Sequence, residues 1–361
     1  MSSPVFVIAE AGVNHNGSLD CARKLIDVAA DAGADAVKFQ TFRSELVISR
    51  GARKAQYQVT NTGDDESQLE MVKRLELDLE AHRMLIAHAR SRGIMFLSTP
   101  FDLESLHVLT EVLDLPRLKI ASGELTNLPL LLACGRTSRP LIVSTGMCTL
   151  GEVEQALAAL AFAGVTAADA PPTEAEMAQA FRSAAGQAFL GERVSLLHCT
   201  TEYPAPVEDV NLRAMSAMRA AFGLPVGYSD HTRGLHVSIA AVALGASIIE
   251  KHFTLDRSMP GPDHVASLEP TELVALVSGI RDVEQALGSG LKIPAPSELK
   301  NIDIARKSLV AAVPIRRGER FVASNLTTKR PGHGISAMRY HDYLDRVATR
   351  DYAADELIDE S

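Results

Sequence analysis

The feature of this sequence that most restricts its fold is a regular alternation of short β-rich runs with longer amphipathic stretches. Most of the short runs are followed by a segment with apolar residues at helical spacing, such as LDCARKLIDVAADAG. The candidate strands are Val5–Ala9, Ala36–Gln40, Ile94–Ser98, Leu118–Ile120, Leu141–Ser144, Ser195–Cys199, Val226–Ser229 and Ser247–His252. This alternation predicts parallel strands joined by helices. Eight such units favour a closed (β/α)8 TIM barrel.

A doubly wound open sheet is the alternative fold for the same alternation. That fold usually carries a glycine-rich phosphate-binding turn after its first strand. Here the turn reads AEAGVNHNG, which lacks the GxGxxG pattern, and this favours the barrel. Two long connections, residues 43–75 and 164–193, are expected to form excursions near the rim of the barrel.

The composition changes after the last predicted barrel helix. The segment GSGLKIPAPSELKN is a linker that carries Gly, Pro and Ser, and the residues after it indicate short strands and turns. We therefore predict a barrel domain over residues 1–288, a linker over 289–306 and a small domain over 307–361. The small domain is below the size that comfortably supports its own core, so we expect it to pack on something larger.

Charge and composition exclude several classes of partner. The formal net charge is −9 and there is no basic block, so neither nucleic acid nor an anionic membrane is expected as a partner. The N-terminus does not have the pattern of a signal peptide, and the longest apolar run is too short to span a bilayer. Cys21, Cys134, Cys148 and Cys199 show no CxxC spacing and indicate free thiols. We expect a cytoplasmic protein.

Polar residues recur at the ends of the predicted strands, which is where a parallel barrel carries its active site. In chain order they are Glu10, Lys38, Gln40, Thr99, Lys119, Ser122, Glu124, Ser144, Thr201, Tyr203, His231, Glu250 and His252. Taken singly, each has an ordinary alternative. An inward lysine can pair with a neighbouring carboxylate, a serine can cap a helix, and His15 and His198 can be structural histidines. The recurrence at nearly every strand indicates a site.

These residue types point to a particular chemistry. Lys38 and Lys119, with hydroxyl groups near helix N-termini, are typical of a site for a compact dianion such as a phosphate ester. His231 and His252 end adjacent predicted strands, so their imidazoles can converge on one divalent metal such as Mn²⁺, Fe²⁺, Co²⁺ or Zn²⁺. Two protein ligands leave coordination positions open, as in a Lewis-acid catalyst. Glu250 is expected to face inward, either supporting the metal site or forming a buried ion pair.

Long segments of the chain resemble the N-acetylneuraminate (sialic acid) synthase family. They include IAEAGVNHNGSLDCARKLIDVAADAGADAVKFQTF, FLSTPFD, LKIASGELTN, LIVSTGM, LLHCTTEYPAPVEDVNLRAM, VGYSDHT and EKHFTLDRSMPGPDH. The segment RKSLVAAVPIRRGERFVASNLTTKRPGHG resembles the antifreeze-like (SAF) domain that ends these enzymes. The HCTTEYPAP variant resembles the bacterial branch that includes N,N'-diacetyllegionaminate synthases.

The resemblance implies condensation of phosphoenolpyruvate with an N-acetylmannosamine-type sugar. The products would be phosphate and a nonulosonic acid, either N-acetylneuraminate or N,N'-diacetyllegionaminate. It implies phosphoenolpyruvate contacts at Lys38, Lys119, Ser122 and Ser144, sugar contacts at Glu10, Tyr203 and Asp263, and Mn²⁺ ligands at His231 and His252. Mg²⁺ or Co²⁺ are alternative metals. It also implies a domain-swapped homodimer in which Arg330 reaches the partner subunit's site.

Some assignments depart from the family pattern or go beyond it. Thr201 stands where some sialic acid synthases carry an asparagine that helps to hold phosphoenolpyruvate, so its contact is an open question. PGHG replaces the more usual PGTG or PGNG. We add Thr99 as a substrate-binding residue and Glu10 as a catalytic one. Glu124, two residues after Ser122, is predicted to manage protons or to stabilise a cationic intermediate.

Two other functional classes stay open. A metal-dependent aldolase-type lyase would use the same barrel and metal but would need no phosphoenolpyruvate site. A sugar- or ice-binding protein would act through its C-terminal module and would have no use for the lysines and histidines of the barrel. For the synthase, the acceptor is N-acetylmannosamine, its 6-phosphate or 2,4-diacetamido-2,4,6-trideoxy-mannose, and we expect a non-phosphorylated one.

Overall fold

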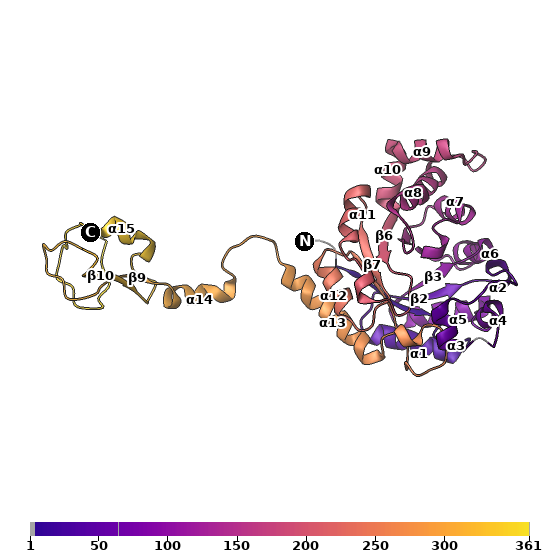
Figure 1. The fold of residues 1–361 in the computed structure, drawn as a ribbon, viewed down its shortest axis with the longest axis horizontal. Helices are drawn as coiled ribbons and strands as arrows, with labels where there is room; N and C mark the ends of the chain where they lie inside the picture. Colours follow the sequence, from indigo (N-terminus) through magenta and orange to yellow (C-terminus); the bar gives the residue numbers. More distant parts are fainter. Residues whose placement is uncertain (1–3, 64, 361) are drawn as a thin grey trace. The chain divides into compact units, whose positions relative to one another are not determined.

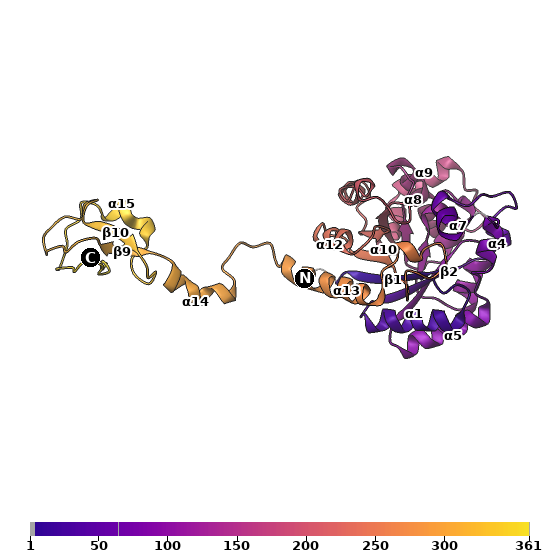
Figure 2. The ribbon, with the colours of Figure 1, turned by 60° about the horizontal axis from the view of Figure 1, so that its bottom comes forward.

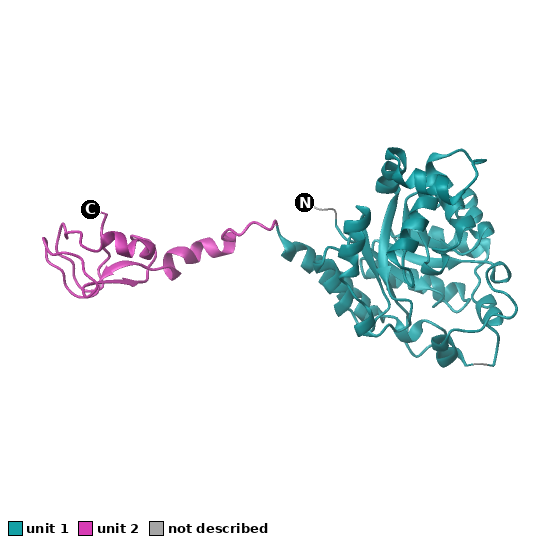
Figure 3. Ribbon diagram, turned by 45° about the horizontal axis from the view of Figure 1, so that its top comes forward, with its two compact units in different colours: residues 1–288 teal, residues 289–361 magenta. Residues whose placement is uncertain are grey.

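The computed structural model describes residues 4–63 and 65–360, and the chain divides into two compact units, residues 1–288 and 289–361 (Figure 3). Each unit has its own cluster of buried apolar side chains. The segment predicted as a linker, residues 289–306, carries helix α14 (Pro296–Ala305). No helix within the described ranges combines the length and the apolar character that crossing a bilayer requires.

The larger unit is built around eight parallel strands. They are β1 (Phe6–Gly12), β2 (Ala36–Thr41), β3 (Met95–Pro100), β4 (Leu118–Ile120), β5 (Leu141–Ser144), β6 (Val194–Cys199), β7 (Val226–Asp230) and β8 (Ile248–His252). Their hydrogen-bonded order is β3-β2-β1-β8-β7-β6-β5-β4, and β3 also contacts β4, so the sheet nearly closes on itself (Figure 1). The predicted barrel is confirmed, and the open doubly wound sheet is excluded.

Helices connect the strands. The helices of this unit are α1 (Leu19–Asp31), α2 (Ser44–Val47), α3 (Gln56–Thr62), α4 (Gln68–Lys73), α5 (Leu79–Ser91), α6 (Leu103–His107), α7 (Leu128–Arg136), α8 (Leu150–Val165), α9 (Glu174–Arg182), α10 (Ala184–Arg193), α11 (Ala214–Phe222), α12 (His236–Ala243) and α13 (Pro270–Leu287). The longer ones, such as α1, α5 and α13, cover the outside of the barrel (Figure 2). Side chains of Ser18, Asp78 and Thr149 cap α1, α5 and α8 by accepting a backbone N–H. The first long connection holds α2, α3 and α4, and the second holds α9 and α10.

The alternation of strand residues produces two buried layers. Val37 and Phe39 of β2 face the helices and belong to the large core between sheet and helices. The opposite face fills the barrel interior with an apolar layer made of Ile8, Ala36, Leu97, Ile142, Leu197 and Ile248. Toward the carboxyl ends of the strands the interior becomes polar, since Glu10 is in register with Lys38 on one side and with His252 on the other. The fold therefore gathers the polar strand ends at one mouth.

The smaller unit has a short antiparallel pair, β9 (Ser308–Ala311) and β10 (Leu326–Lys329), with Leu326 opposite Ala311. A short helix, α15 (Tyr340–Tyr343), follows. Its buried apolar side chains are Leu309, Ala311, Ile315, Phe321, Leu326, Ile335, Tyr343, Ala348, Tyr352 and Ile358. The short strands and turns predicted for this region are therefore present.

Candidate active site

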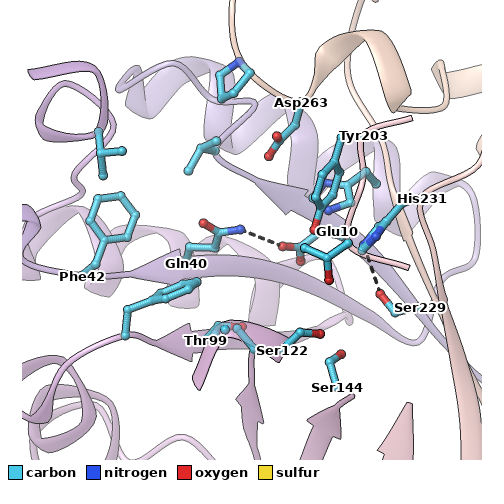
Figure 4. A pocket seen from close by; sticks show the side chains of 18 of the residues that line it. Glu10, Gln40, Phe42, Thr99, Ser122, Ser144, Tyr203, Ser229, His231 and Asp263 are labelled. Carbon is cyan, nitrogen blue, oxygen red and sulfur yellow. Dashed lines mark hydrogen bonds between the residues drawn. The ribbon is translucent and has the colours of Figure 1, made fainter. Parts of the chain in front are cut away.

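A cavity of about 410 Å³ opens among the carboxyl ends of the barrel strands (Figure 4). The predicted site residues that line it are Glu10, Lys38, Thr99, Lys119, Ser122, Ser144, Thr201, Tyr203, His231, His252 and Asp263. Each of the eight strands, or the turn just after it, supplies at least one of them, and they meet because parallel strands of a barrel end at the same face. Glu250, whose inward orientation was predicted, also lines the cavity.

Two lysines and two glutamates form the floor of the cavity. Lys38 Nζ lies 2.8 Å from Glu10 Oε2, and Lys119 Nζ lies 3.3 Å from Glu250 Oε1. Lys38 Nζ is also 3.8 Å from Glu250 Oε2. All four side chains are at most 5% exposed. The pairing of each inward lysine with a carboxylate, which was the ordinary alternative for these residues, is therefore present in the site.

Burial and neighbouring charges shift the pKa values of Glu10 and Glu250 in opposite directions. Burial raises the pKa of Glu10 to about 7, although Lys38 acts in the opposite direction. Burial also favours the neutral form of Glu250, but Lys119 and Lys38 outweigh it and lower the pKa of Glu250 to about 2. Glu10 can therefore take up or release a proton near neutral pH, whereas Glu250 stays ionised.

Hydroxyl groups and a backbone N–H lie beside Lys119. Lys119 Nζ donates to Ser144 Oγ at 2.7 Å, and Ser122 Oγ accepts the N–H of Gly146 at 2.9 Å. The buried Oγ1 of Thr201 makes no hydrogen bond within the described residues. A side chain at Gly146 would place its Cβ 2.3 Å from that oxygen, so the glycine leaves space that a larger residue would fill. This corner of the cavity is suited to a small oxyanion.

His231 and His252 approach each other at the ends of β7 and β8, with 5.5 Å between ring centroids. His231 Nδ1 donates to the carbonyl of Thr200 at 2.6 Å, so the lone pair lies on its Nε2. His252 Nδ1 is buried and has no hydrogen-bond partner in the described part of the chain. Burial lowers the pKa of His231 to about 4 and also depresses the pKa of His252.

A neutral imidazole can donate a nitrogen lone pair to a metal, and two of them suit a divalent metal of borderline softness. Within residues 4–63 and 65–360, no group of three or more His, Cys, Asp or Glu side chains is arranged to hold a metal. The two histidines would therefore leave most coordination positions to substrate or water.

Aromatic and polar side chains line the upper part of the cavity. The Tyr203 ring lies 4.1 Å from the His231 ring and 5.1 Å from the Tyr57 ring, centroid to centroid. Gln40 Nε2 donates to Glu10 Oε1 at 3.4 Å, as Figure 4 shows. Burial raises the pKa of Asp263 to about 6. These groups offer donors and acceptors to a polyhydroxylated ligand above the ionic floor.

One side of the cavity is apolar, and sequence reasoning missed it. We call this surface the apolar wall, and it consists of Val13, Phe42, Val47, Ile48, Met71, Val72, Leu75 and Phe101. Most of these residues belong to the first long connection, whose short helices carry no periodic signal that relates them to the strands. Gln40, which was predicted to share one face of β2 with Lys38 but was given no role, also lines the cavity.

Some predicted residues do not join the cavity. In the described part of the chain, Glu124 is not among the lining residues, and its half-buried carboxylate accepts the side-chain N–H of Asn127 at 2.6 Å. His198 Nε2 contacts the carbonyl of Val210 at 2.6 Å, which fits its structural alternative. Arg330 belongs to the smaller unit, where its exposed side chain donates through Nε to the carbonyl of Ala305 at 3.0 Å.

His15 is fully buried beside the site without lining it. Its Nδ1 accepts the N–H of Gly17 at 3.0 Å, which fits a structural histidine. Burial lowers the pKa of His15 to about 4.

Known proteins resemble this chain along nearly its whole length. N,N'-diacetyllegionaminic acid synthase of Campylobacter jejuni subsp. jejuni serotype O:2 is 54% identical over 354 residues, which cover 98% of each chain. The enzyme of the same name from Legionella pneumophila subsp. pneumophila is 44% identical over 335 residues, which cover 93% of this chain and 88% of that one.

A solved structure also shares this fold and sequence. The N-acetylneuraminic acid (sialic acid) synthetase from Leptospira borgpetersenii serovar Hardjo-bovis, in complex with citrate, has a TM-score of 0.65 and 34% identity, covering 83% of this chain and 90% of that chain. A sequence profile of the NeuB family matches residues 25–292, and one of the SAF domain matches residues 306–361. The chain therefore belongs to the NeuB family and ends in a SAF domain.

Proposed function

We propose that this protein is a synthase that condenses phosphoenolpyruvate with 2,4-diacetamido-2,4,6-trideoxy-mannose to give N,N'-diacetyllegionaminate and phosphate. The observation that carries the proposal is one cavity that holds both an oxyanion corner and a histidine pair. An aldolase-type lyase needs the histidine pair but has no use for the corner at Lys119, Ser122 and Ser144. A binding protein that acts through its SAF domain has no use for either. The names of the relatives from Campylobacter jejuni and Legionella pneumophila support the same acceptor.

We propose that phosphoenolpyruvate binds at the polar floor of the cavity. Lys119, Ser122 and Ser144 supply donors for its phosphate or carboxylate oxygens, and charge-assisted bonds of this kind contribute about 1.5–3 kcal/mol each. In the reaction, C3 of phosphoenolpyruvate attacks the aldehyde carbon of the open-chain sugar. Water then adds at C2, and the tetrahedral intermediate loses phosphate.

Glu10 is our candidate for moving the proton that carbon–carbon bond formation requires. Its carboxyl lines the cavity, and its pKa of about 7 lets it give a proton to the developing alkoxide of the sugar. Glu250 stays ionised between the two lysines, where it raises the pKa of Lys38 and acts against the burial that lowers the pKa of Lys119.

We propose that His231 and His252 hold a divalent metal, with Mn²⁺ as the expected ion and Mg²⁺ or Co²⁺ as alternatives. When bound, such an ion supplies Lewis-acid stabilisation of negative charge on the aldehyde oxygen. The chain contributes two neutral imidazoles, one of them fixed in its tautomer by the carbonyl of Thr200.

The apolar wall supports a deoxygenated acceptor. A methyl group placed against the wall residues gains about 0.8 kcal/mol from burial, whereas a hydroxymethyl group there would have to turn to Gln58 or Gln68, which also line the cavity, for a hydrogen bond. A 6-phosphate would need cations, and the only cationic side chains among the described lining residues are Lys38 and Lys119, both paired with carboxylates. These observations support an acceptor with a methyl group at C6.

We also propose a cytoplasmic homodimer in which Arg330 completes the partner subunit's site. Arg330 is exposed and forms no ion pair among the described residues, so its guanidinium is available to a ligand. Leu291, Ile293 and Leu299 are 72%, 66% and 56% exposed, which supports a covering surface in an assembly. The four cysteines are free thiols, as expected in a reducing compartment.

The experiment that tests the function measures phosphate release from phosphoenolpyruvate with Mn²⁺ and each of the three acceptors in separate reactions. We expect release only with 2,4-diacetamido-2,4,6-trideoxy-mannose and only without a chelator. Release with N-acetylmannosamine instead would support the proposed reaction and contradict the proposed acceptor. No release with any acceptor from folded, metal-supplied protein would overturn the synthase reaction in favour of a lyase.

A further inference from the structure

We infer that Asp230 and Lys251 form a positioning clamp that sets the spacing of His231 and His252 from the outer face of the barrel. Asp230 immediately precedes His231, and Lys251 immediately precedes His252. The two clamp residues are strand partners in the register of β7 and β8. The inference rests on the proposed metal-binding role of the two histidines and assigns new residues to it.

The clamp is a fully buried ion pair on the side of the strands that faces away from the cavity. Lys251 Nζ lies 3.0 Å from Asp230 Oδ2, and the two side chains are 1% and 0% exposed. Glu250 and His252 line the cavity whereas Lys251, which lies between them, does not, as the alternation of a strand requires. The pair therefore acts from behind the histidines and does not compete with substrate.

Asp230 forms hydrogen bonds with Thr232, the residue that follows His231. Its Oδ1 accepts both the N–H and the hydroxyl of Thr232, each at 2.8 Å, so one carboxylate holds the residues on either side of the histidine. Its Oδ2 accepts the hydroxyl of Ser238 from α12 at 2.6 Å. Lys251 Nζ also donates to the carbonyl of Thr232. The loop that carries His231 is thus tied directly to the residue that precedes His252.

The His252 ring is held by packing, with its centroid 5.6 Å from that of Tyr203 and 5.5 Å from that of His231, and by the backbone that carries it. His252 Nδ1 makes no hydrogen bond within the described residues, whereas His231 has the carbonyl of Thr200. Because no hydrogen bond at Nδ1 from the described residues fixes the ring, the backbone of β8 contributes strongly to where the His252 imidazole lies. Lys251 fixes that backbone against the loop after β7, so the clamp controls the distance between the two rings.

A purely stabilising role would not require these residue types. At the helix-facing positions of β2 the chain uses Val37 and Phe39, which pack without any cost of desolvating charge. A buried ion pair seldom stabilises a fold more than apolar side chains of the same volume do. Asp230 and Lys251 are, however, satisfied by several hydrogen bonds, and a satisfied polar network fixes a single geometry. That is the property that a two-ligand metal site needs.

The test measures Mn²⁺ affinity and the free energy of unfolding on the full-length, metal-stripped protein. The variants are Lys251→Met and Asp230→Asn, with Ser238→Ala as a milder change that removes one bond to Asp230. Free Mn²⁺ is followed by electron paramagnetic resonance during titration. Loss of residues that orient metal ligands typically costs roughly 10–100-fold in affinity, and we expect this increase in Kd for the two stronger variants. Ser238→Ala should raise Kd by a smaller factor in the same direction.

Two controls separate positioning from general destabilisation. Arg281→Met breaks a pair with Asp35 at 2.8 Å, located at the amino ends of the strands, and should lower stability without changing the Mn²⁺ Kd. His231→Ala should abolish tight Mn²⁺ binding. Suppose that His231→Ala loses Mn²⁺ binding but the clamp variants keep the wild-type Kd. The clamp is then wrong and the metal site stands. If the two stronger variants do not fold, Ser238→Ala alone decides in the same way. If His231→Ala binds as wild type does, the metal site is wrong and the clamp with it.

Discussion

Lys119 Nζ lies 3.3 Å from Glu250 Oε1, and Glu250 Oε2 lies 3.8 Å from Lys38 Nζ, so one buried carboxylate serves both cations of the cavity floor. Glu250→Gln removes its charge while keeping its shape. We expect a loss of about 3–5 kcal/mol in the free energy of unfolding, measured in urea, because two buried cations lose their shared anion. Inorganic phosphate should restore part of this loss. The matched exchange Glu45→Gln, in an exposed pair with Lys73, should change little, and equal effects of the two exchanges would contradict this account.

The two candidate proton carriers can be separated by substitution. Glu10→Gln should lower kcat roughly 10²–10⁴-fold, since Glu10 lines the cavity with a pKa of about 7. Glu124→Gln should leave kcat within about 3-fold of wild type, because Glu124 contacts Asn127 and does not line the described cavity. Steady-state kinetics on both variants checks this. A larger loss in the Glu124 variant would restore the role that its position in the sequence predicted.

Gly146→Ala tests the oxyanion corner. The added Cβ would lie 2.3 Å from Thr201 Oγ1 and 2.9 Å from Ser122 Oγ, in the space assigned to a phosphoenolpyruvate oxygen. We expect the KM for phosphoenolpyruvate to rise at least about 10-fold, equivalent to the loss of one charge-assisted hydrogen bond, with the acceptor KM nearly unchanged. Gly151→Ala on α8 is a control, since its Cβ meets no atom closer than 3.9 Å. An unchanged KM for phosphoenolpyruvate would place that substrate elsewhere in the cavity.

Val72→Thr tests the apolar wall. The exchange keeps the side-chain shape and adds a hydroxyl to the wall, on α4. We expect the ratio of kcat/KM for the 6-deoxy acceptor over that for N-acetylmannosamine to fall by about 10-fold, as the hydroxymethyl group gains a partner and the methyl group loses one. Val59→Thr makes the same exchange on α3 at a residue that does not line the described cavity. A ratio that moves equally in both variants would exclude the wall as the determinant.

Acid should destabilise the protein through its buried histidines. Burial lowers the pKa of His15 to about 4, so between pH 6.5 and 4 the unfolded chain binds a proton there that the folded chain does not. The stability contributed by neutral His15 is complete above pH 6.5 and is lost as pH falls toward 4. For His15 alone, the loss between pH 7.5 and pH 5 is about 2 kcal/mol. In urea unfolding across this range, the free energy of unfolding of His15→Gln should fall less steeply with decreasing pH than that of wild type. Identical pH dependence of the two proteins would contradict the depressed pKa of His15.

Much of the site could be predicted because the barrel is built from one strand–helix pattern that recurs along the chain and can be recognised locally in the sequence. The strands found at Leu118–Ile120 and Leu141–Ser144 have the predicted bounds. The first strand, predicted to end at Ala9, extends three residues further, to Gly12. Once strand ends are known, parallel topology places their polar residues at one mouth. This is why Lys38 and His252, which lie far apart in sequence, could be assigned to one cavity.

Glu124 shows where that reasoning stops. It follows Ser122 by two residues, but the chain turns into a 3-10 helix at Ser122–Glu124, and strand alternation no longer describes where the side chain points. Its carboxylate turns to Asn127 instead. The apolar wall escaped prediction for a related reason, since short helices of an irregular connection reach the cavity through contacts that no local period encodes.

The sequence by itself determined the barrel, its order of strands and helices, and the gathering of lysines, hydroxyls and histidines at the strand ends. These follow from hydrophobic periodicity and from the rule that parallel strands share a direction. Only the tertiary structure decided which carboxylate neutralises which lysine, which glutamate can carry a proton, and that Asp230 and Lys251 join behind the two histidines. Those properties depend on distances between side chains and on burial, and both arise only when segments distant in sequence pack together.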